Sequence, residues 1–597
     1  MRVATSLVTA ALLFALNASV ADVTQVKTDV RYLASEQLAG RMTGTEGEQL
    51  AADYIAAQLK AIGAQPLPGR DSMLHPFEFT AGMDDGGSSV TIHRGDEALV
   101  FASEDVQALS FSDNATARGE VVFAGYGLYV PEEKGFGYDS YFGLDVKDKI
   151  VVVLRYVPAD VDDEARSILA RYSGLRYKAL HARELGAKAI VLVSGPRSPN
   201  SGETIPMSFD SALGSSGIVA TSISGAVAEQ LFASLPEGGL EKVQQELDSG
   251  NPHIQGFSLP DLELSLETKV LREKRIGHNV LAMLPPTVES DQWVVVGAHY
   301  DHLGHGDRGS SLAGKEDAGK VHFGADDNAS GVAATLEVAR RLKKVERPMA
   351  VAFGFWSGEE LGLLGSTHFV QEEMTAFEPP LAYLNFDMVG RMRDEEVMIQ
   401  SVGSSPVWRR LIEQTNVMAG LDLSLQDDPY LPTDSTAFYQ AEVPALHLFT
   451  GSHENYHKPS DTAETINYEG IDAIATFTTR LVGKLMRYDG DVEYATVERR
   501  QESGTDRDTV RAWTGTVPDY SQEVEGLLLS GVIGGGPADQ AGLQKGDVIV
   551  RFGEREITNI YDYTFALDVA RIDEELVVEY LRDGERKKTT LTPTQRK

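Results

Sequence analysis

Uninterrupted apolar segments alternate with amphipathic helical segments between about residues 275 and 490. Strands that are buried on both faces have this composition, and their alternation with helices is typical of a mainly parallel sheet. We therefore predict an α/β fold in which a mixed, mainly parallel sheet is sandwiched by helices. The predicted strands are Val294 to His299, Met349 to Phe355, Leu381 to Asp387 and Ala445 to Phe449, and the predicted helices are Ser330 to Val345 and Ile471 to Tyr488.

Histidines and carboxylates follow these strands or precede the helices beside them. In open α/β sheets, ligands bind beyond the carboxyl ends of the strands, so we expect these side chains to gather at one edge. Imidazole and carboxylate suit zinc, and two zinc ions about 3.5–4 Å apart can share a water molecule and a substrate oxygen. The residues concerned are His299-Tyr300-Asp301-His302, Asp326-Asp327-Asn328, Glu359-Glu360, Asp387 and His457.

Glu359 and Glu360 directly follow the strand that ends near Phe355. Neighbouring side chains in a strand point to opposite faces, and beyond its end the chain turns, so the two carboxylates can have different targets. One can hold a metal ion while the other transfers a proton. The ordinary alternative is a pair of solvated charges, and the spacing alone leaves open which Glu takes which role.

This succession of residues resembles that of the secreted dizinc aminopeptidases (peptidase family M28), a superfamily that also contains glutamate carboxypeptidase and the transferrin receptor. The resemblance extends more weakly to Gly40-Arg41 and the predicted helix Glu46 to Ile62. It leaves the register of Asp326 and Asp327 open by one residue. Position by position, it implies that His299 and Asp387 hold one zinc ion, that Glu360 and His457 hold the other, that Asp327 bridges them, that Glu359 is the general base, that Asp301 orients His299, and that Tyr456 stabilises the oxyanion.

The activity that the resemblance implies is hydrolysis of N-terminal residues from peptides with a free N-terminus, by water activated between two Zn²⁺ ions. A carboxypeptidase or a dipeptidase on the same scaffold is an alternative. A non-catalytic, receptor-like homologue is another, but such a protein should have lost metal ligands. This chain keeps five ligands and the base, which favours an enzyme.

A second zinc motif, H-E-x-x-H, occurs at His453-Glu454-Asn455-Tyr456-His457. Its single-zinc chemistry requires a helix that brings both imidazoles to one face. Gly451 and Pro459 flank the segment, so we expect no helix there. The other histidines of the region are expected outside the ligand set, in surface, supporting or core positions: His302, His305, His322 and His447.

The rest of the chain reads as further modules. Short strands and a helix at Tyr177 to Gly186 indicate an inserted α/β module, and a β-rich domain is predicted at the C-terminus. Gly125-Tyr126-Gly127 and the segment His181 to Ala187 resemble a protease-associated (PA) domain, and Gly536-Pro537-Ala538 with Gly546-Asp547 resembles a PDZ domain, whose candidate loop for a C-terminal peptide is Thr514 to Val517. The predicted ranges are 22–100 and 265–490 for a split zinc peptidase domain, 105–260 for the PA domain, 491–509 for a linker and 510–597 for the PDZ domain.

The first 21 residues have the features of a secretory leader: Arg2, an apolar run and the small residues Ser19-Val20-Ala21. We therefore expect export, to the periplasm or outside the cell. The chain has no Cys, so neither disulfides nor thiolate metal sites can form, which favours a bacterial envelope. A net charge of −35 argues against nucleic acid and anionic membrane partners. No later segment has the apolar length of a membrane span.

Overall fold

The computed structural model describes residues 23–133, 136–198, 200–207, 216–236, 238–251, 254, 256–307, 311–313, 315–497, 512–518, 524–553, 555–558, 562–563, 566–567 and 570–595. The predicted leader and most of the predicted linker lie outside these residues. The chain forms two compact units. The first takes in the chain up to Phe79 and from Arg275 to Arg500, and the second takes in Thr80–Lys274 and most residues after 500. Among the described residues, no helix is long and apolar enough to cross a membrane.

The first unit is built on an eight-stranded mixed sheet with the order β1-β12-β14-β13-β15-β18-β16-β17. The four central strands β14, β13, β15 and β18 run parallel, as predicted. The neighbours of this central group, β12 and β16, pair with it in the antiparallel sense. The strands are β1 (Leu74–Asp85), β12 (Val270–Leu284), β13 (Trp293–His299), β14 (Ala350–Trp356), β15 (Tyr383–Phe386), β16 (Glu396–Gln400), β17 (Asp422–Leu425) and β18 (Ala445–Phe449).

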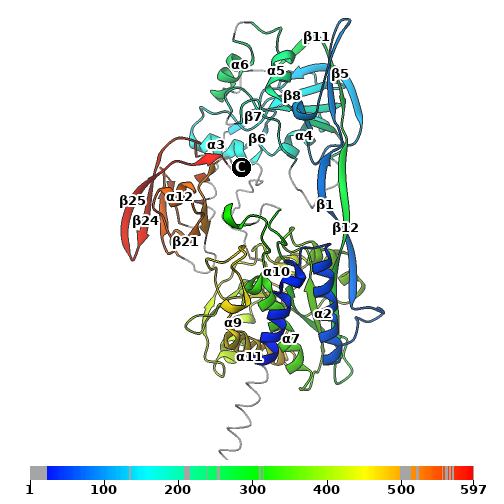
Figure 1. The fold of residues 1–597 in the computed structure, drawn as a ribbon, viewed down its shortest axis with the longest axis vertical. Coiled ribbons are helices and arrows are strands. Elements are labelled where there is room, and N and C mark those ends of the chain that lie inside the picture. Colours follow the sequence, from blue (N-terminus) through cyan, green and yellow to red (C-terminus); the bar gives the residue numbers. More distant parts are fainter. Residues whose placement is uncertain are drawn as a thin grey trace, which may run out of the picture. The chain divides into compact units, whose positions relative to one another are not determined.

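Helices cover both faces of this sheet because its central strands are apolar on both sides. Along β13, Val294 and Val296 pack into one hydrophobic cluster with helices α2, α7 and α11 (Figure 1), whereas Val295 packs into a cluster on the opposite face with α10. The first face is covered by residues 23–33, α2 (Glu46–Ile62), α7 (Gly331–Leu342), α9 (Trp408–Asn416) and α11 (Tyr468–Leu485). The second is covered by the turn Phe369–Glu373, which follows α8 (Leu364–His368), and by α10 (Asp434–Gln440).

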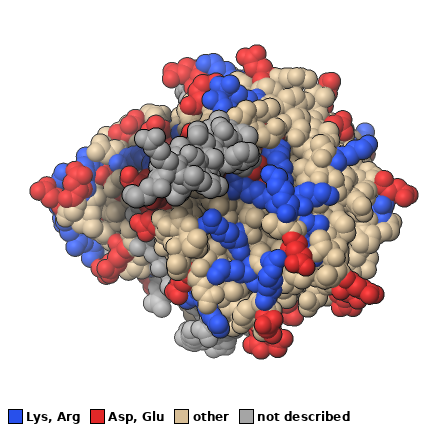
Figure 2. All heavy atoms as spheres, turned by 90° about the horizontal axis from the view of Figure 1, so that it is seen from below, with Lys and Arg blue, Asp and Glu red and all other residues tan. Residues whose placement is uncertain are grey.

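Basic residues occupy the last turns of three helices of the first unit. They are Lys60 in α2, Arg340 and Arg341 in α7, and Lys484 in α11. Figure 2 shows Lys and Arg side chains gathered on one face, although the chain is strongly acidic. Cations at helix C-termini offset the negative end of the helix dipole, which accounts for these positions.

The second unit contains a second eight-stranded sheet, in the order β3-β2-β11-β5-β8-β9-β10-β4, whose strands β5, β8, β9 and β10 run parallel. β2 pairs here with β11, and β3 pairs with β2, so the first segment of this unit runs from Thr80, earlier than the predicted boundary near residue 100, to Lys274. Its elements are β2 (Ser89–Arg94), β3 (Glu97–Ala102), β4 (Val106–Ala108), β5 (Thr116–Phe123), β6 (Tyr129–Glu133), β7 (Phe136–Asp139), β8 (Ile150–Leu154), α3 (Asp163–Arg171), α4 (Leu175–Glu184), β9 (Ala189–Val193), β10 (Val219–Ile223), α5 (Gly225–Leu231), α6 (Gly239–Asp248) and β11 (Phe257–Glu267).

The C-terminal domain is an antiparallel β-rich structure with its own hydrophobic cluster, which includes Leu529, Ile549 and Val578. Its short helix α12 begins at Pro537, as the sequence predicts. The elements are β19 (Ala512–Trp513), β20 (Thr516–Pro518), β21 (Leu527–Val532), α12 (Pro537–Gln540), β22 (Val548–Phe552), β23 (Arg555–Glu556), β24 (Leu576–Arg582), β25 (Glu585–Leu591) and β26 (Thr594–Gln595).

Candidate metal centre

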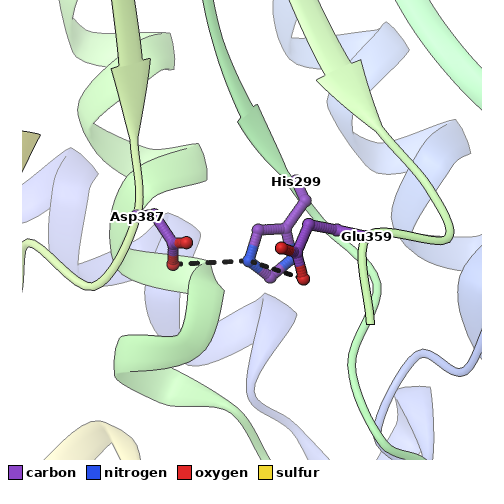
Figure 3. Close-up of side chains that lie close together, drawn as sticks. All are labelled: His299, Glu359 and Asp387. Carbon is purple, nitrogen blue, oxygen red and sulfur yellow. Dashed lines mark hydrogen bonds and ion pairs between the residues drawn. The ribbon is translucent and has the colours of Figure 1, made fainter. Parts of the chain in front are cut away.

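Three parallel strands bring His299, Glu359 and Asp387 together at one edge of the first sheet. His299 is the last residue of β13, Asp387 directly follows β15, and Glu359 follows β14. The Nε2 atom of His299 lies 3.4 Å from Asp387 Oδ1 and 4.0 Å from Glu359 Oε2 (Figure 3). His299 is buried, so its imidazole faces these carboxylates away from bulk water.

A second group forms around Glu360. His457, in the loop after β18, places Nε2 3.1 Å from Glu360 Oε2. His302 places Nδ1 2.7 Å from Glu360 Oε1 and 3.8 Å from Asp327 Oδ2. The two adjacent glutamates therefore face different groups: Glu359 faces His299, and Glu360 faces His302 and His457.

Asp327 lies between the two groups. Its Oδ1 is 3.3 Å from His299 Nε2, and its Oδ2 is 3.2 Å from His457 Nε2. The residue belongs to the irregular turn Ala325–Ser330 and precedes a cis peptide bond to Asn328. The backbone N–H groups of Asp326 and Asp327 both donate to Asp461 Oδ2, at 2.9 and 3.1 Å, which holds the turn in place.

The donor atoms fit zinc. Two sets, His299 with Glu359 and Asp387 and His302 with Asp327 and Glu360, each bring one ligand atom per residue within 4.8 Å of the others. Ligand atoms placed tetrahedrally about 2.0–2.1 Å from zinc lie about 3.3 Å apart. The Nε2 atoms of His299 and His457 lie at close to this separation, 3.1 to 3.4 Å, from the nearest oxygens of Asp327, Asp387 and Glu360. The distances to Glu360 leave both His302 and His457 within reach of an ion.

The two glutamates differ in charge. Although burial opposes it, His457 and His302 lower the pKa of Glu360 to about 2, so this carboxyl is ionised. Burial and the nearby carboxylates of Asp387 and Asp434 raise the pKa of Glu359 well above its ordinary value. Environments that separate two carboxyls in this way allow them distinct chemical roles.

Asp301 lies behind His299 on the side away from Asp387. Its Oδ1 is 3.7 Å from His299 Nδ1, longer than a hydrogen bond, and accepts the backbone N–H of Glu359 at 3.2 Å. Its Oδ2 accepts the Thr43 hydroxyl at 3.1 Å. One buried carboxylate thus lies against both His299 and the segment that bears Glu359.

Tyr456 stacks on His457, with ring centroids 3.8 Å apart and planes at 25°. Burial and the negative charges of Asp327, Glu360, Glu359 and Asp387 raise the pKa of Tyr456 well above its ordinary value. Its phenol therefore keeps its proton at neutral pH and can act as a hydrogen-bond donor at the edge of the second group.

The H-E-x-x-H segment is not helical, as expected. Residues 454–457 form turns, and His457 has a φ of 53°, which lies outside the right-handed helical region. His453 points instead to Asp326, with Nε2 3.1 Å from Oδ2. The other oxygen of Asp326 accepts a hydrogen bond from the backbone N–H of Gly390 at 2.6 Å. Asp326 therefore faces away from the two groups of candidate metal ligands, whereas Asp327 faces both.

The sequence analysis did not identify Asp434 as part of the site, and it placed His302 outside the ligand set. Asp434, the first residue of α10, is completely buried, and neither of its carboxylate oxygens accepts a hydrogen bond of ordinary geometry from the described residues. Burial and the charges of Asp301 and Asp387, offset in part by His299 and Ser366, raise the pKa of Asp434 to about 7. In the sequence, Thr433-Asp434-Ser435 is an ordinary helix start, so only the fold reveals this carboxyl beside the site.

The chain matches three known families. Residues 279–482 match peptidase family M28, residues 117–231 match the PA domain and residues 509–592 match the PDZ domain. An aminopeptidase of Pseudomonas aeruginosa (strain UCBPP-PA14) is 27% identical over 360 residues, which cover 60% of this chain and 55% of that one. The chain therefore spans about half the length of that relative.

Two further proteins are similar over more of their length. Aminopeptidase YwaD of Bacillus subtilis (strain 168) is 24% identical over 461 residues, which cover 75% of this chain and 82% of that one. The solved structure of an aminopeptidase from Aneurinibacillus sp. strain AM-1 aligns with a TM-score of 0.46 at 20% identity, over 80% of this chain and 98% of that one. The chain therefore carries a segment of peptidase family M28 at residues 279–482, together with a PA domain and a PDZ domain.

Proposed function

We propose that the chain is a zinc-dependent aminopeptidase that hydrolyses N-terminal residues from peptides with a free N-terminus. One observation carries this proposal: the two oxygens of Asp327 face two different imidazoles, 3.3 Å from His299 and 3.2 Å from His457. A carboxylate in that position suits a bridge between two ions. The printed names of the P. aeruginosa and B. subtilis relatives support an aminopeptidase.

In this proposal the two ions are shared among five side chains. His299 and Asp387 would hold one zinc ion, Glu360 and His457 would hold the other, and Asp327 would contact both. When bound, the zinc pair would polarise the scissile carbonyl and lower the pKa of a water molecule. Asp301 would orient His299 through its Nδ1 side, as a carboxylate behind a ligating imidazole commonly does.

The remaining chemistry falls to residues that hold or move protons. Glu359, which faces the His299 side of the site, would take the proton of the attacking water and pass it to the leaving amine. The Tyr456 phenol would donate a hydrogen bond to the oxygen on which negative charge develops. Carboxylates of the same site would bind the ammonium group of the free N-terminus.

The flanking segments suggest where the enzyme acts and what else it binds. The leader-like first 21 residues suggest export, to the periplasm or beyond it. The PDZ domain would bind a C-terminal peptide at the loop Thr514 to Val517. In this loop Gly515 has a φ of 73°, and its carbonyl accepts the backbone N–H of Ile533 at 2.7 Å.

A pair of glutamine variants tests the assignment. Glu359→Gln should abolish turnover while about two zinc ions per chain stay bound, because it removes the base and no ligand. Glu454→Gln, which changes the exposed Glu of the H-E-x-x-H segment, should keep most activity. Zinc content is measured by atomic emission and turnover with leucine p-nitroanilide. If Glu454→Gln instead abolished turnover and Glu359→Gln kept it, the single-zinc H-E-x-x-H site would replace the two-zinc assignment.

The choice of peptide end needs a second comparison. Amino-acid p-nitroanilides and peptides with a free N-terminus should be cleaved, whereas the same peptides with an acetylated N-terminus should not. Cleavage of blocked peptides alone would overturn the aminopeptidase. If the zinc-loaded chain cleaves none of these substrates, a receptor-like protein is the better description.

A further inference from the structure

A cavity of about 710 Å³ lies within the PA domain, and none of its lining residues belongs to the candidate metal centre. Its volume is in the range of ligand-binding sites, about 300–1,000 Å³. The walls come from three segments: the strand β6, the loop that follows β7, and one side of helix α4. All of them belong to the second compact unit.

Aromatic rings form much of the wall. The imidazole of His181 stacks on Tyr129, with centroids 4.5 Å apart and planes at 9°, and lies parallel to Tyr177, at 6.4 Å and 7°. Tyr141 meets the same imidazole edge-on at 5.2 Å and 67°. Phe142, which also lines the cavity, is 65% exposed. Aromatic faces that are held together in this way attract cations.

The charges around the cavity favour a cation as well. Three carboxylates line it, those of Asp139, Asp145 and Glu184, whereas Lys147 is the one Lys or Arg among the lining residues. Asp145 is partly neutralised by Lys149, 3.5 Å away. Burial lowers the pKa of His181, so the imidazole between the tyrosines adds no positive charge at neutral pH. The negative charges therefore outnumber the positive ones at this site.

Tyr141 supplies an unused polar group. Its side chain is buried, and its hydroxyl has no hydrogen-bond partner among the described residues. A buried hydroxyl without a partner costs free energy that a bound ligand can recover.

We propose that this cavity binds an arginine or lysine side chain of an extended peptide segment, with the cation over the aromatic rings and near Asp139 and Glu184. The binding site is separate from the proposed catalytic site and from the proposed C-terminal peptide site of the PDZ domain. The proposal for this cavity can therefore be tested independently of the proposed activity.

The probe is chosen so that neither of those other sites can bind it. A fluorescein-labelled peptide of alternating arginine and glycine, acetylated at its N-terminus and amidated at its C-terminus, is titrated with the full chain and followed by anisotropy. The same peptide with citrulline in place of arginine keeps the shape and removes the charge. We expect the citrulline peptide to bind about fivefold more weakly, or more weakly still. An exposed cation–π contact contributes up to about fivefold, and attraction to Asp139 and Glu184 is lost as well.

Two exposed positions test the place of binding. Phe142→Ala and Glu184→Gln should each weaken binding of the arginine peptide by about two- to fivefold. The matched controls are Val100→Ala, also exposed and apolar at 69%, and Glu241→Gln on α6, and neither should change it. Circular dichroism checks that each variant is folded. Either of two results would overturn the site. Equal binding of both peptides would mean that the positive charge is not recognised, and equal effects of test and control variants would leave only general attraction to an acidic chain.

Discussion

At the scale of single residues, the most informative comparison is between His302 and His457. Both imidazoles lie close to Glu360, at 2.7 and 3.1 Å, and both are near Asp327 Oδ2, at 3.8 and 3.2 Å. His457 is closer to Asp327, the carboxylate that would contact both ions. The buried His302 lies next to the other oxygen of Glu360, Oε1, where it can hold that carboxylate in position.

This difference predicts distinct zinc contents for two variants. His457→Ala should bind about one zinc ion per chain, because it removes a proposed ligand, and should lose nearly all activity. His302→Ala should keep about two ions, with a zinc affinity weaker by about 10–100-fold, as for other residues that support a ligand. Zinc stoichiometry and competition with a chelator measure both quantities.

The exposed His305 provides a control, because His305→Ala should change neither quantity. Should His302→Ala lose one ion while His457→Ala keeps two, the second metal ligand is His302 and the assignment to His457 is wrong.

At the scale of secondary structure, sequence reasoning succeeded where local patterns decide the outcome. The helix α2 occupies Glu46–Ile62 as predicted, because its apolar face is periodic and Gly63, with a φ of 90°, ends it. β18 also has its predicted bounds, since it is a short apolar run that is buried along its whole length.

Long-range pairing could not be predicted in the same way. β2 and β3 belong to the second sheet only because His93 pairs with Glu263 across many intervening residues, which no local pattern encodes. The candidate site shows the same limit. The strand ends identified most of its residues, but His302 and Asp434 acquire their positions from the fold around them.

Arg41 joins three elements around the site from a completely buried position. Its guanidinium donates hydrogen bonds to the carbonyls of Tyr300 at 2.8 Å, Phe323 at 2.8 Å and Gly324 at 3.0 Å. A further bond reaches Leu33 O, at the end of the first helical segment. Burial lowers its pKa to about 10, so it stays charged at neutral pH. Arg41 thus fixes the strand end after His299 against the turn that holds Asp327.

Arg41→Lys should therefore destabilise the first unit. An ammonium group cannot reproduce the planar fork, so some of these buried carbonyls lose their donor. We expect the free energy of unfolding to fall by about 2–4 kcal/mol, measured by urea denaturation. The exposed Arg393→Lys is the control and should change it by less than about 0.5 kcal/mol. Equal stability of the two variants would mean that Arg41 does not hold these elements together.

Glu373, which ends the turn Phe369–Glu373, links this region to strand β1. Its Oε2 lies 2.6 Å from His75 Nδ1 and 3.2 Å from Arg70, and His368 lies 3.9 Å from its other oxygen. Although burial opposes it, the hydrogen bond from His75 and the charges of His75, Arg70 and His368 lower the pKa of Glu373 below its ordinary value. The folded state thus binds this proton less tightly than the unfolded state does.

The sign of the pH dependence follows from that lowered pKa. The ionised Glu373 stabilises the fold at pH values above the unfolded pKa of about 4.3, and this contribution is lost as the pH falls through the lower folded pKa. Glu373→Gln should therefore cost about 1–2 kcal/mol at neutral pH, and the difference from the unchanged protein should vanish in acid. Urea denaturation across the pH range measures it, with the exposed Glu372→Gln as the control. A difference that persists in acid would point to lost packing instead of lost charge.

At the scale of the whole molecule, the two compact units have separate hydrophobic clusters. Both sets of His and carboxylate residues that could hold a metal ion among the described residues lie in the first unit. There the buried Asp301 and Asp327 and the half-buried Glu360 lie in one site, and removal of zinc leaves their negative charges without a cation. Bound zinc should therefore stabilise the first unit and leave the second unchanged.

Differential scanning calorimetry can separate these contributions. Zinc at about 1,000 times its dissociation constant stabilises a folded unit by about 4 kcal/mol, which corresponds to about 6–7 °C for a unit of roughly 300 residues. Chelation should lower one thermal transition by about that amount, added zinc should restore it, and a second transition should stay where it is. His299→Ala identifies the transition of the first unit, because in this variant chelation should lower the temperature of that transition by only a small part of the expected amount. A chelator that shifts both transitions equally, or neither, would contradict a metal centre confined to the first unit.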